Sequence, residues 1–246
     1  KSSMKTTLVL LFYIIAVFAC RHKENPEEKK SDSLEIKKEN SGTDENEHNC
    51  SYYNKTYNLG IGLIKAPTTF EIFNDSLLTE RMLKINVYED EDHINFCSVF
   101  HKPDYGIMHF ICIEENENFY KVLIGFSDQK FLPKREDYQF KSWKDYILES
   151  FGIRRALEFK ETTFLKREPL DNSQTITIPD GHELFCPVEV KGDWVKVKYD
   201  CFYNTTNNPY EGQLCHEYID TCEKEMIGWL KWRNENEILI DIFLLP

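Results

Sequence analysis

The chain has 246 residues and a formal net charge of −12, with 42 acidic and 30 basic side chains. Such an acidic protein repels nucleic-acid phosphates and anionic lipid head groups, so we expect no nucleic acid partner. The charge suits cationic peptides or simple solubility. The sequence contains no phosphate loop, dinucleotide fingerprint, HExxH pair or nucleophile elbow, so we expect no enzyme, no catalytic residues, no cofactor and no metal.

Residues 4–20 have the pattern of an export signal. One Lys is followed by an uncharged apolar run, and the segment ends in Ala19-Cys20. The run is shorter than the ~20 apolar residues that a membrane span needs. The segment resembles a bacterial lipoprotein signal peptide, which implies that Cys20 is acylated, for example with palmitate, and becomes the new N-terminus. The open alternatives are a eukaryotic secretory signal and an uncleaved anchor.

From this resemblance we expect residues 1–20 to form the signal peptide, with residues 1–3 upstream of the natural start at Met4. The mature protein is then expected in the cell envelope, anchored by lipid to a bacterial membrane and facing the periplasm or the cell exterior. Residues 21–48 contain only Leu34 and Ile36 as strongly apolar side chains. Such a segment cannot bury enough surface to offset its conformational entropy, so it is predicted to be a disordered tether.

Residues 50–152 are predicted to form a β-rich N-terminal domain. Short β-rich runs separated by turn residues are typical of strands in sandwiches or small barrels. They occur here at residues 83–88, 107–113 and 119–124.

One short helix is expected at the end of this domain. Ser142 can cap it, Asp145 follows three positions later, and Gly152 can end it. Its apolar face would consist of Trp143, Tyr146, Ile147 and Phe151. The boundary between the two halves of the chain is predicted just after this helix, near residues 152–160.

The C-terminal half contains a second informative pattern. Residues 192–197 (GDWVKV) read as a turn that leads into a strand, and residues 228–232 (GWLKW) as the strand that returns beside it. This pair resembles bacterial SH3-like domains, which some lipoproteins of unknown function also carry. The resemblance covers residues 160–246 and implies a small β-barrel, with residues 174–178 and 183–190 as earlier strands. It departs from the family at residues 200–226, a long insertion in place of a short hairpin.

The N-terminal half is a candidate for a degenerate copy of the same domain. Residues 119–122 and 129–134 stand where residues 193–197 and 228–232 stand in the second half. Two architectures are open: tandem SH3-like barrels, or one barrel beside an unrelated β-rich half.

The cysteines predict disulfides, because an exported protein matures in an oxidising compartment. Seven cysteines are left once Cys20 is acylated, so at least one is unpaired. Cys201, Cys215 and Cys222 lie in the insertion, and Cys201 is expected to pair with Cys222 or Cys215, because the ends of the insertion should approach each other. The alternatives are free thiols or a metal set with His216, whose spacing is unusual. Cys97 and Cys112 are either small core residues or a cross-strand bridge.

Aromatic side chains are the remaining candidates for ligand binding. SH3-like domains bind extended peptides in an aromatic-lined groove, so the resemblance implies such a role here. The alternative role for these residues is core packing, and polar neighbours favour Trp232 and Tyr210 as ligand contacts. The full set of candidates is Trp194, Trp229, Trp232, Tyr199 and Tyr210.

These features predict a non-catalytic, membrane-tethered binding or structural module. Its partner would be an extracytoplasmic peptide, protein or cell-wall strand. The alternative is an inhibitor or immunity-type protein that blocks a toxin or a hydrolase. A hydrolase is the least favoured interpretation.

Overall fold

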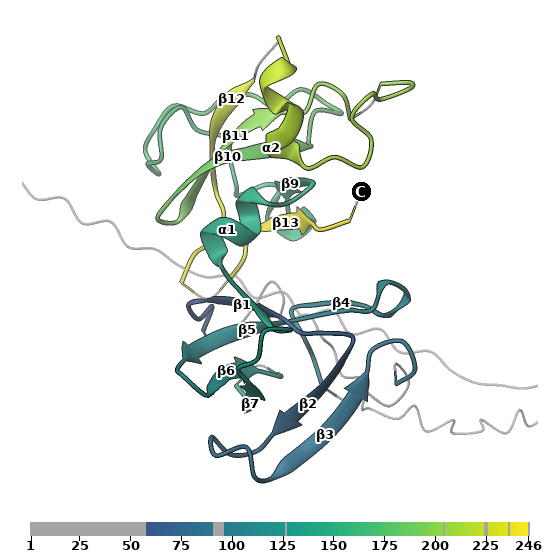
Figure 1. Ribbon diagram of the computed structural model, residues 1–246. Coiled ribbons are helices and arrows are strands. Elements are labelled where there is room, and N and C mark those ends of the chain that lie inside the picture. Colours follow the sequence, from purple (N-terminus) through teal and green to yellow (C-terminus); the bar gives the residue numbers. More distant parts are fainter. Residues whose placement is uncertain are drawn as a thin grey trace, which may run out of the picture. The chain divides into compact units, whose positions relative to one another are not determined.

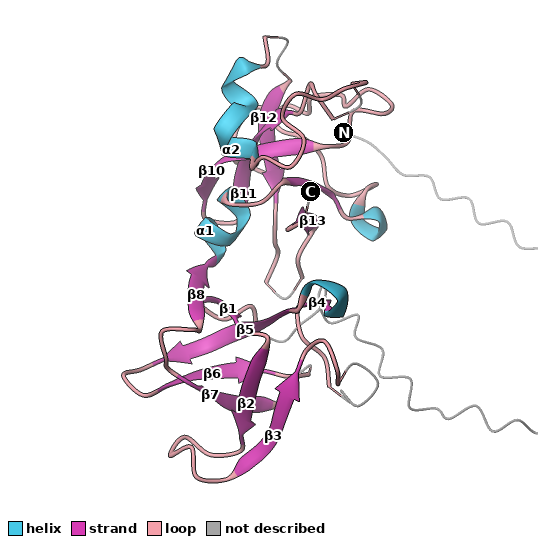
Figure 2. Ribbon diagram, turned by 45° about the vertical axis from the view of Figure 1, so that its right-hand side comes forward, coloured by secondary structure: helices cyan, strands magenta, loops and turns pink. Residues whose placement is uncertain are grey.

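The computed structural model describes residues 58–90, 96–125, 127–203, 205–223, 226–235 and 237–245. The expected signal peptide with Cys20, the expected tether and Cys50 lie outside these ranges. The described chain is mainly β, as predicted, and its helices are short (Figures 1 and 2). Within these ranges, no helix has the length and apolar character needed to cross a membrane.

The first sheet has eight strands, and all of its pairs are antiparallel. Their order is β3-β2-β7-β6-β5-β1-β8, and β4 also pairs with β5. The strands are β1 (Gly62–Lys65), β2 (Thr69–Phe73), β3 (Arg81–Asn86), β4 (Phe100–Lys102), β5 (Ile107–Glu115), β6 (Phe119–Leu123), β7 (Gln129–Pro133) and β8 (Gln139–Ser142).

This sheet is covered on both faces. Neighbouring residues of a strand point to opposite faces, and here both faces enter a buried cluster. On β5, Ile111 belongs to one cluster, whereas Phe110 and Cys112 belong to the other. Burial on both sides explains why residues 107–113 are a nearly continuous apolar run without polar alternation.

The predicted helix is α1 (Trp143–Leu148). The Ser142 hydroxyl accepts a hydrogen bond from the Asp145 backbone N–H at 3.2 Å, which caps its first turn. Trp143, Tyr146 and Ile147 are its buried residues. The helix stops at Leu148, so Gly152 does not end it, as the sequence had suggested, but begins the next strand.

The second sheet contains the strand pair expected from the sequence. Its order is β12-β11-β10-β9-β13, and Val195 of β11 lies opposite Leu230 of β12. Its strands are β9 (Gly152–Arg155), β10 (Phe185–Lys191), β11 (Trp194–Tyr199), β12 (Ile227–Lys231) and β13 (Ile240–Phe243). The short helices are α2 (Cys215–Tyr218), η3 (Pro103–Tyr105), η4 (Leu157–Phe159) and η5 (Ile219–Thr221).

The second sheet is not a closed barrel, which corrects the expectation of one. β12 and β13 lie at the two ends of the strand order. The predicted strand at residues 174–178 does not form, and Lys166 makes only single bridges to Thr175 and Trp229. Pro169 and Pro179, which have no backbone N–H to donate to a ladder, flank this segment. The sheet also begins at Gly152, earlier than the expected domain start at residue 160.

The two sheets share one topology. In the first sheet, β1, β5, β6, β7 and β8 form the path β7-β6-β5-β1-β8, and the second sheet forms the path β12-β11-β10-β9-β13. If the five strands of each set are numbered 1 to 5 in chain order, both paths read 4-3-2-1-5. Moreover, Phe73 of β2 pairs with Phe131 of β7, as Lys166 pairs with Trp229 of β12. The same five-stranded plan therefore occurs twice, and β3 and β4 are strands of the first sheet with no counterpart in the second.

Candidate binding site

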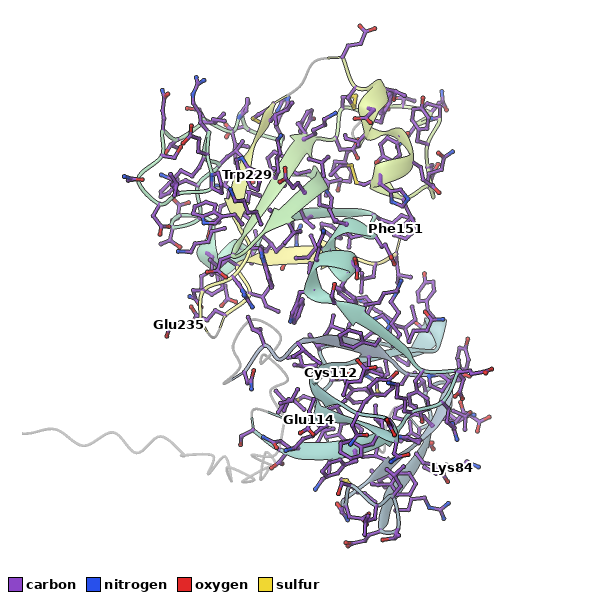
Figure 3. The ribbon with its side chains drawn as sticks, turned by 60° about the vertical axis from the view of Figure 1, so that its left-hand side comes forward. Lys84, Cys112, Glu114, Phe151, Trp229 and Glu235 are labelled. Carbon is purple, nitrogen blue, oxygen red and sulfur yellow. A yellow bond between two sulfur atoms is a disulfide. The ribbon has the colours of Figure 1, made fainter. Side chains whose placement is uncertain are left out.

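The insertion, residues 200–226, connects β11 to β12 and is held by two disulfides. One joins Cys201 to Cys222, one of the two pairings expected from the sequence. The other joins Cys215 to Cys186 of β10, a residue that was not among the candidates. Figure 3 shows sulfur atoms in yellow beside α2. Because all three cysteines of the insertion are oxidised in this way, none is available as a thiolate for the alternative metal set.

Cys97 and Cys112, expected to be either core residues or bonded to each other, have different states. Cys97 is also disulfide-bonded. Cys112 is a free, buried thiol on β5, so the possible bridge between Cys97 and Cys112 does not form. Burial raises the pKa of Cys112 to about 12.

The disulfides lie in a small core of their own, separate from the two larger clusters. Its buried residues are Cys186, Cys215, Tyr218, Ile219 and Cys222. Tyr210 stacks on Tyr218 with ring centroids 5.0 Å apart, and Phe202 meets Tyr210 edge-on at 4.8 Å. Closing a loop of this length contributes about 3 kcal/mol in the chain-entropy model. The insertion is therefore a packed element rather than a loose loop.

A pocket of about 510 Å³ opens on this core, and we call it the Asp200 pocket. Its volume is within the range of small-molecule sites. Phe151, labelled in Figure 3, contributes to its wall. The described residues that line it are Phe151, Leu184, Asp200, Tyr203, Thr205, Asn207, Asn208, Tyr210, Glu211, Gly212, Gln213, Tyr218, Phe243 and Leu245.

Asp200 is the most buried acidic side chain of the described chain, with 2% of its surface exposed. One carboxylate oxygen accepts from the Phe202 backbone N–H, and the other accepts from the Tyr218 hydroxyl, both at 3.0 Å. Burial, followed by the negative charge of Asp200, raises the pKa of Tyr218. The Tyr218 hydroxyl therefore stays protonated and acts as the donor in this pair. A carboxylate offers about four lone-pair positions, so acceptor capacity is left over.

Of the five aromatic candidates, only Tyr210 lines the Asp200 pocket. Trp229, labelled in Figure 3, is 9% exposed, and Trp232 is 2% exposed. The Trp232 indole donates to the Gly192 carbonyl at 2.9 Å. Both tryptophans are core residues and, unlike Asp200, line none of three pockets that the described residues form, so the preference for Trp232 as a ligand contact is not supported.

The other two candidates lie elsewhere on the second sheet. Trp194 lines an open pocket of about 560 Å³ beside Asp193, and Lys231 covers its ring at 5.8 Å. Tyr199 packs against His182, with ring centroids 4.6 Å apart. The lining residues Asp200 and Tyr218 were not among the candidates that the sequence indicated. Asp200 directly follows the alternating strand and precedes a cysteine, and this position was its only signal.

Comparison of the chain with protein-family models, curated proteins and solved structures finds no match.

Proposed function

We propose that this protein is a non-catalytic, extracytoplasmic binding module, anchored by lipid at Cys20, that binds a peptide or protein in the Asp200 pocket. One observation carries the proposal. The two sheets share a strand plan, but residues 124–128 connect β6 to β7 in the first sheet, whereas the disulfide-bonded insertion connects β11 to β12 in the second. Binding residues typically lie on loops that a rigid scaffold positions.

The disulfides support the location part of this proposal. They indicate that the protein matures in an oxidising, extracytoplasmic compartment. The pattern of residues 4–20 supports export followed by lipidation. Residues 192–197 and 228–232 resemble SH3-like domains, which bind peptides, and this resemblance supports a binding role.

The chemistry of the buried Cys and His side chains supports a role without catalysis. Cys112 and His109 lie on the same strand, but burial raises the pKa of the Cys112 thiol to about 12 and lowers the pKa of His109 to about 3. At neutral pH neither a thiolate nor an imidazolium forms there. His109 instead shares a hydrogen bond with Tyr146 at 3.0 Å.

The proposal is tested with Tyr203→Ala, which removes a pocket ring that is 57% exposed. Peptides selected from a random display library on the full-length protein should lose binding to this variant. Tyr105→Ala, which removes a ring that is 61% exposed on the first half of the chain, is the matched control and should bind as wild type does. Sedimentation with purified cell-wall polymer tests the cell-wall alternative in parallel. Equal peptide binding by both variants would contradict the proposal.

A further inference from the structure

We infer that the group bound in the Asp200 pocket is a cation, the side chain of a Lys or Arg on a peptide or protein partner. This inference deepens the proposed function and rests on it. It follows from the charges and rings that line the pocket.

The pocket is negatively charged. Asp200 and Glu211 are its two carboxylates, and no Lys, Arg or His occurs among the described residues that line it. None of the ion pairs between described residues includes Asp200. An ionised carboxylate taken out of water is costly unless a cation or several hydrogen bonds compensate it.

Other carboxylates of the same half have basic partners. Glu183, whose side chain is 29% exposed, has two, with Arg155 at 2.7 Å and Lys160 at 3.1 Å. The much more exposed Asp220 pairs with Lys198 at 2.6 Å. Asp200 is more buried than either, yet its described partners are one backbone N–H and one hydroxyl. A cationic ligand would supply the missing positive charge.

The aromatic walls favour an organic cation over a metal ion. Tyr203, Tyr210 and Tyr218 line the pocket, and tyrosine faces attract ammonium and guanidinium groups. The described residues contain no group of three or more His, Cys, Asp or Glu side chains able to hold a metal ion. The amides of Asn207, Asn208 and Gln213 can accept the remaining N–H donors of an amine or guanidinium.

The test is an amide-shift NMR titration of the full-length protein with four small probes. N-acetyl-lysine methylamide and N-acetyl-arginine methylamide are the cationic probes. N-acetyl-norleucine methylamide and N-acetyl-citrulline methylamide are their neutral counterparts of similar shape. The cationic probes should bind at least about tenfold more tightly than the neutral ones, as expected for a charge-assisted hydrogen bond.

Asp200→Asn is the matched variant, because its amide oxygen can still accept from the Phe202 backbone N–H and its NH2 can donate to the Tyr218 hydroxyl oxygen, while the charge is removed. This variant should bind the cationic probes about tenfold more weakly than wild type does and should bind the neutral probes as wild type does. Asp220→Asn makes the same charge change in the same insertion outside this pocket and should have no such effect.

The outcomes separate this inference from the function on which it rests. Equal binding of charged and neutral probes would contradict the inference that the pocket binds a cation. Unchanged binding of the charged probes to Asp200→Asn would contradict it as well. If in that case library peptides still depend on Tyr203, the binding module stands and only its ligand class is wrong. If neither the probes nor peptides bind in a Tyr203-dependent way, both proposals fail.

Discussion

Trp143 and Trp232 lie against each other with ring centroids 5.4 Å apart, although one belongs to α1 and the other follows β12. Each indole also donates to a backbone carbonyl, Trp143 to Leu59 at 2.6 Å and Trp232 to Gly192 at 2.9 Å. Both rings belong to a buried cluster that contains Leu63 and Ile111 of the first sheet as well as residues of the second. The two repeats of the strand plan therefore share one hydrophobic core.

This shared core predicts a large effect of Trp143→Ala. The variant should lower the free energy of unfolding by about 3–5 kcal/mol, because it removes a buried ring and leaves a cavity. Urea unfolding followed by circular dichroism measures the change, and Tyr105→Ala should stay within about 0.5 kcal/mol of wild type. An effect of Trp143→Ala no larger than that of Tyr105→Ala would contradict the shared core.

The glycine of the GWLKW segment is predicted to be required for close packing. A Cβ at Gly228 would lie 2.7 Å from Leu165 Cγ and 2.9 Å from the Lys166 carbonyl oxygen. Gly228→Ala should therefore destabilise the protein by about 1–3 kcal/mol, as overpacking does. Gly125→Ala is the control, because its new Cβ would have its nearest contact at 3.8 Å. Similar melting temperatures for the two variants would refute this explanation.

The disulfide between Cys201 and Cys222 is predicted to stabilise the insertion. Replacing both residues by Ser should lower the free energy of unfolding by about 3 kcal/mol, since the cross-link spans 21 residues. Guanidinium unfolding of the double variant and the wild type measures this loss. Peptide mapping without reductant should recover Cys201–Cys222 and Cys186–Cys215 as linked pairs. Recovery of Cys201 linked to Cys215 would contradict the structure.

His109 predicts a pH dependence of stability. Burial, and secondarily the charge of Lys65, lowers its pKa from 6.5 to about 3, so the unfolded chain binds a proton more readily than the folded one. Keeping His109 neutral therefore contributes to the free energy of unfolding. This contribution is complete above pH 6.5 and is lost as the pH falls from there toward 3, by up to about 1.4 kcal/mol per pH unit.

The readout is the slope of the unfolding free energy between pH 7 and pH 5, compared between wild type and His109→Gln. The variant lacks the titrating ring, so its slope should be shallower than that of the wild type. Its absolute stability does not enter the comparison, so a general loss of packing does not mimic the result. Identical slopes would show that His109 is not held neutral by burial.

The strand β11 could be predicted because Val195 and Val197 are buried while the lysines between and after them are not, which leaves alternating apolar and charged residues in the sequence. The helix α1 could be predicted because its cap uses neighbouring residues, Ser142 and Asp145. Short strands such as β1 and β8 could not, since four residues carry too little pattern to be distinguished from a loop.

The Asp200 pocket was beyond prediction for a different reason. Its walls are set by contacts between residues far apart in sequence, including the bridge from Cys186 to Cys215 across 29 positions. The aromatic candidates were chosen for polar neighbours in sequence, yet Trp232 is enclosed by residues of both sheets. The identity of a cysteine's partner and the burial of an Asp are properties of the fold, and no local pattern reports them.

The binding of a cation in the Asp200 pocket is the central proposal for this protein. The most direct measurement is the map of amide shifts produced by N-acetyl-lysine methylamide on the full-length protein. The largest shifts are expected at Phe202, Tyr210 and Gly212, and in Asp200→Asn they should need about tenfold more probe to appear. Shifts centred instead on Trp194, or unchanged in the variant, would contradict the proposal.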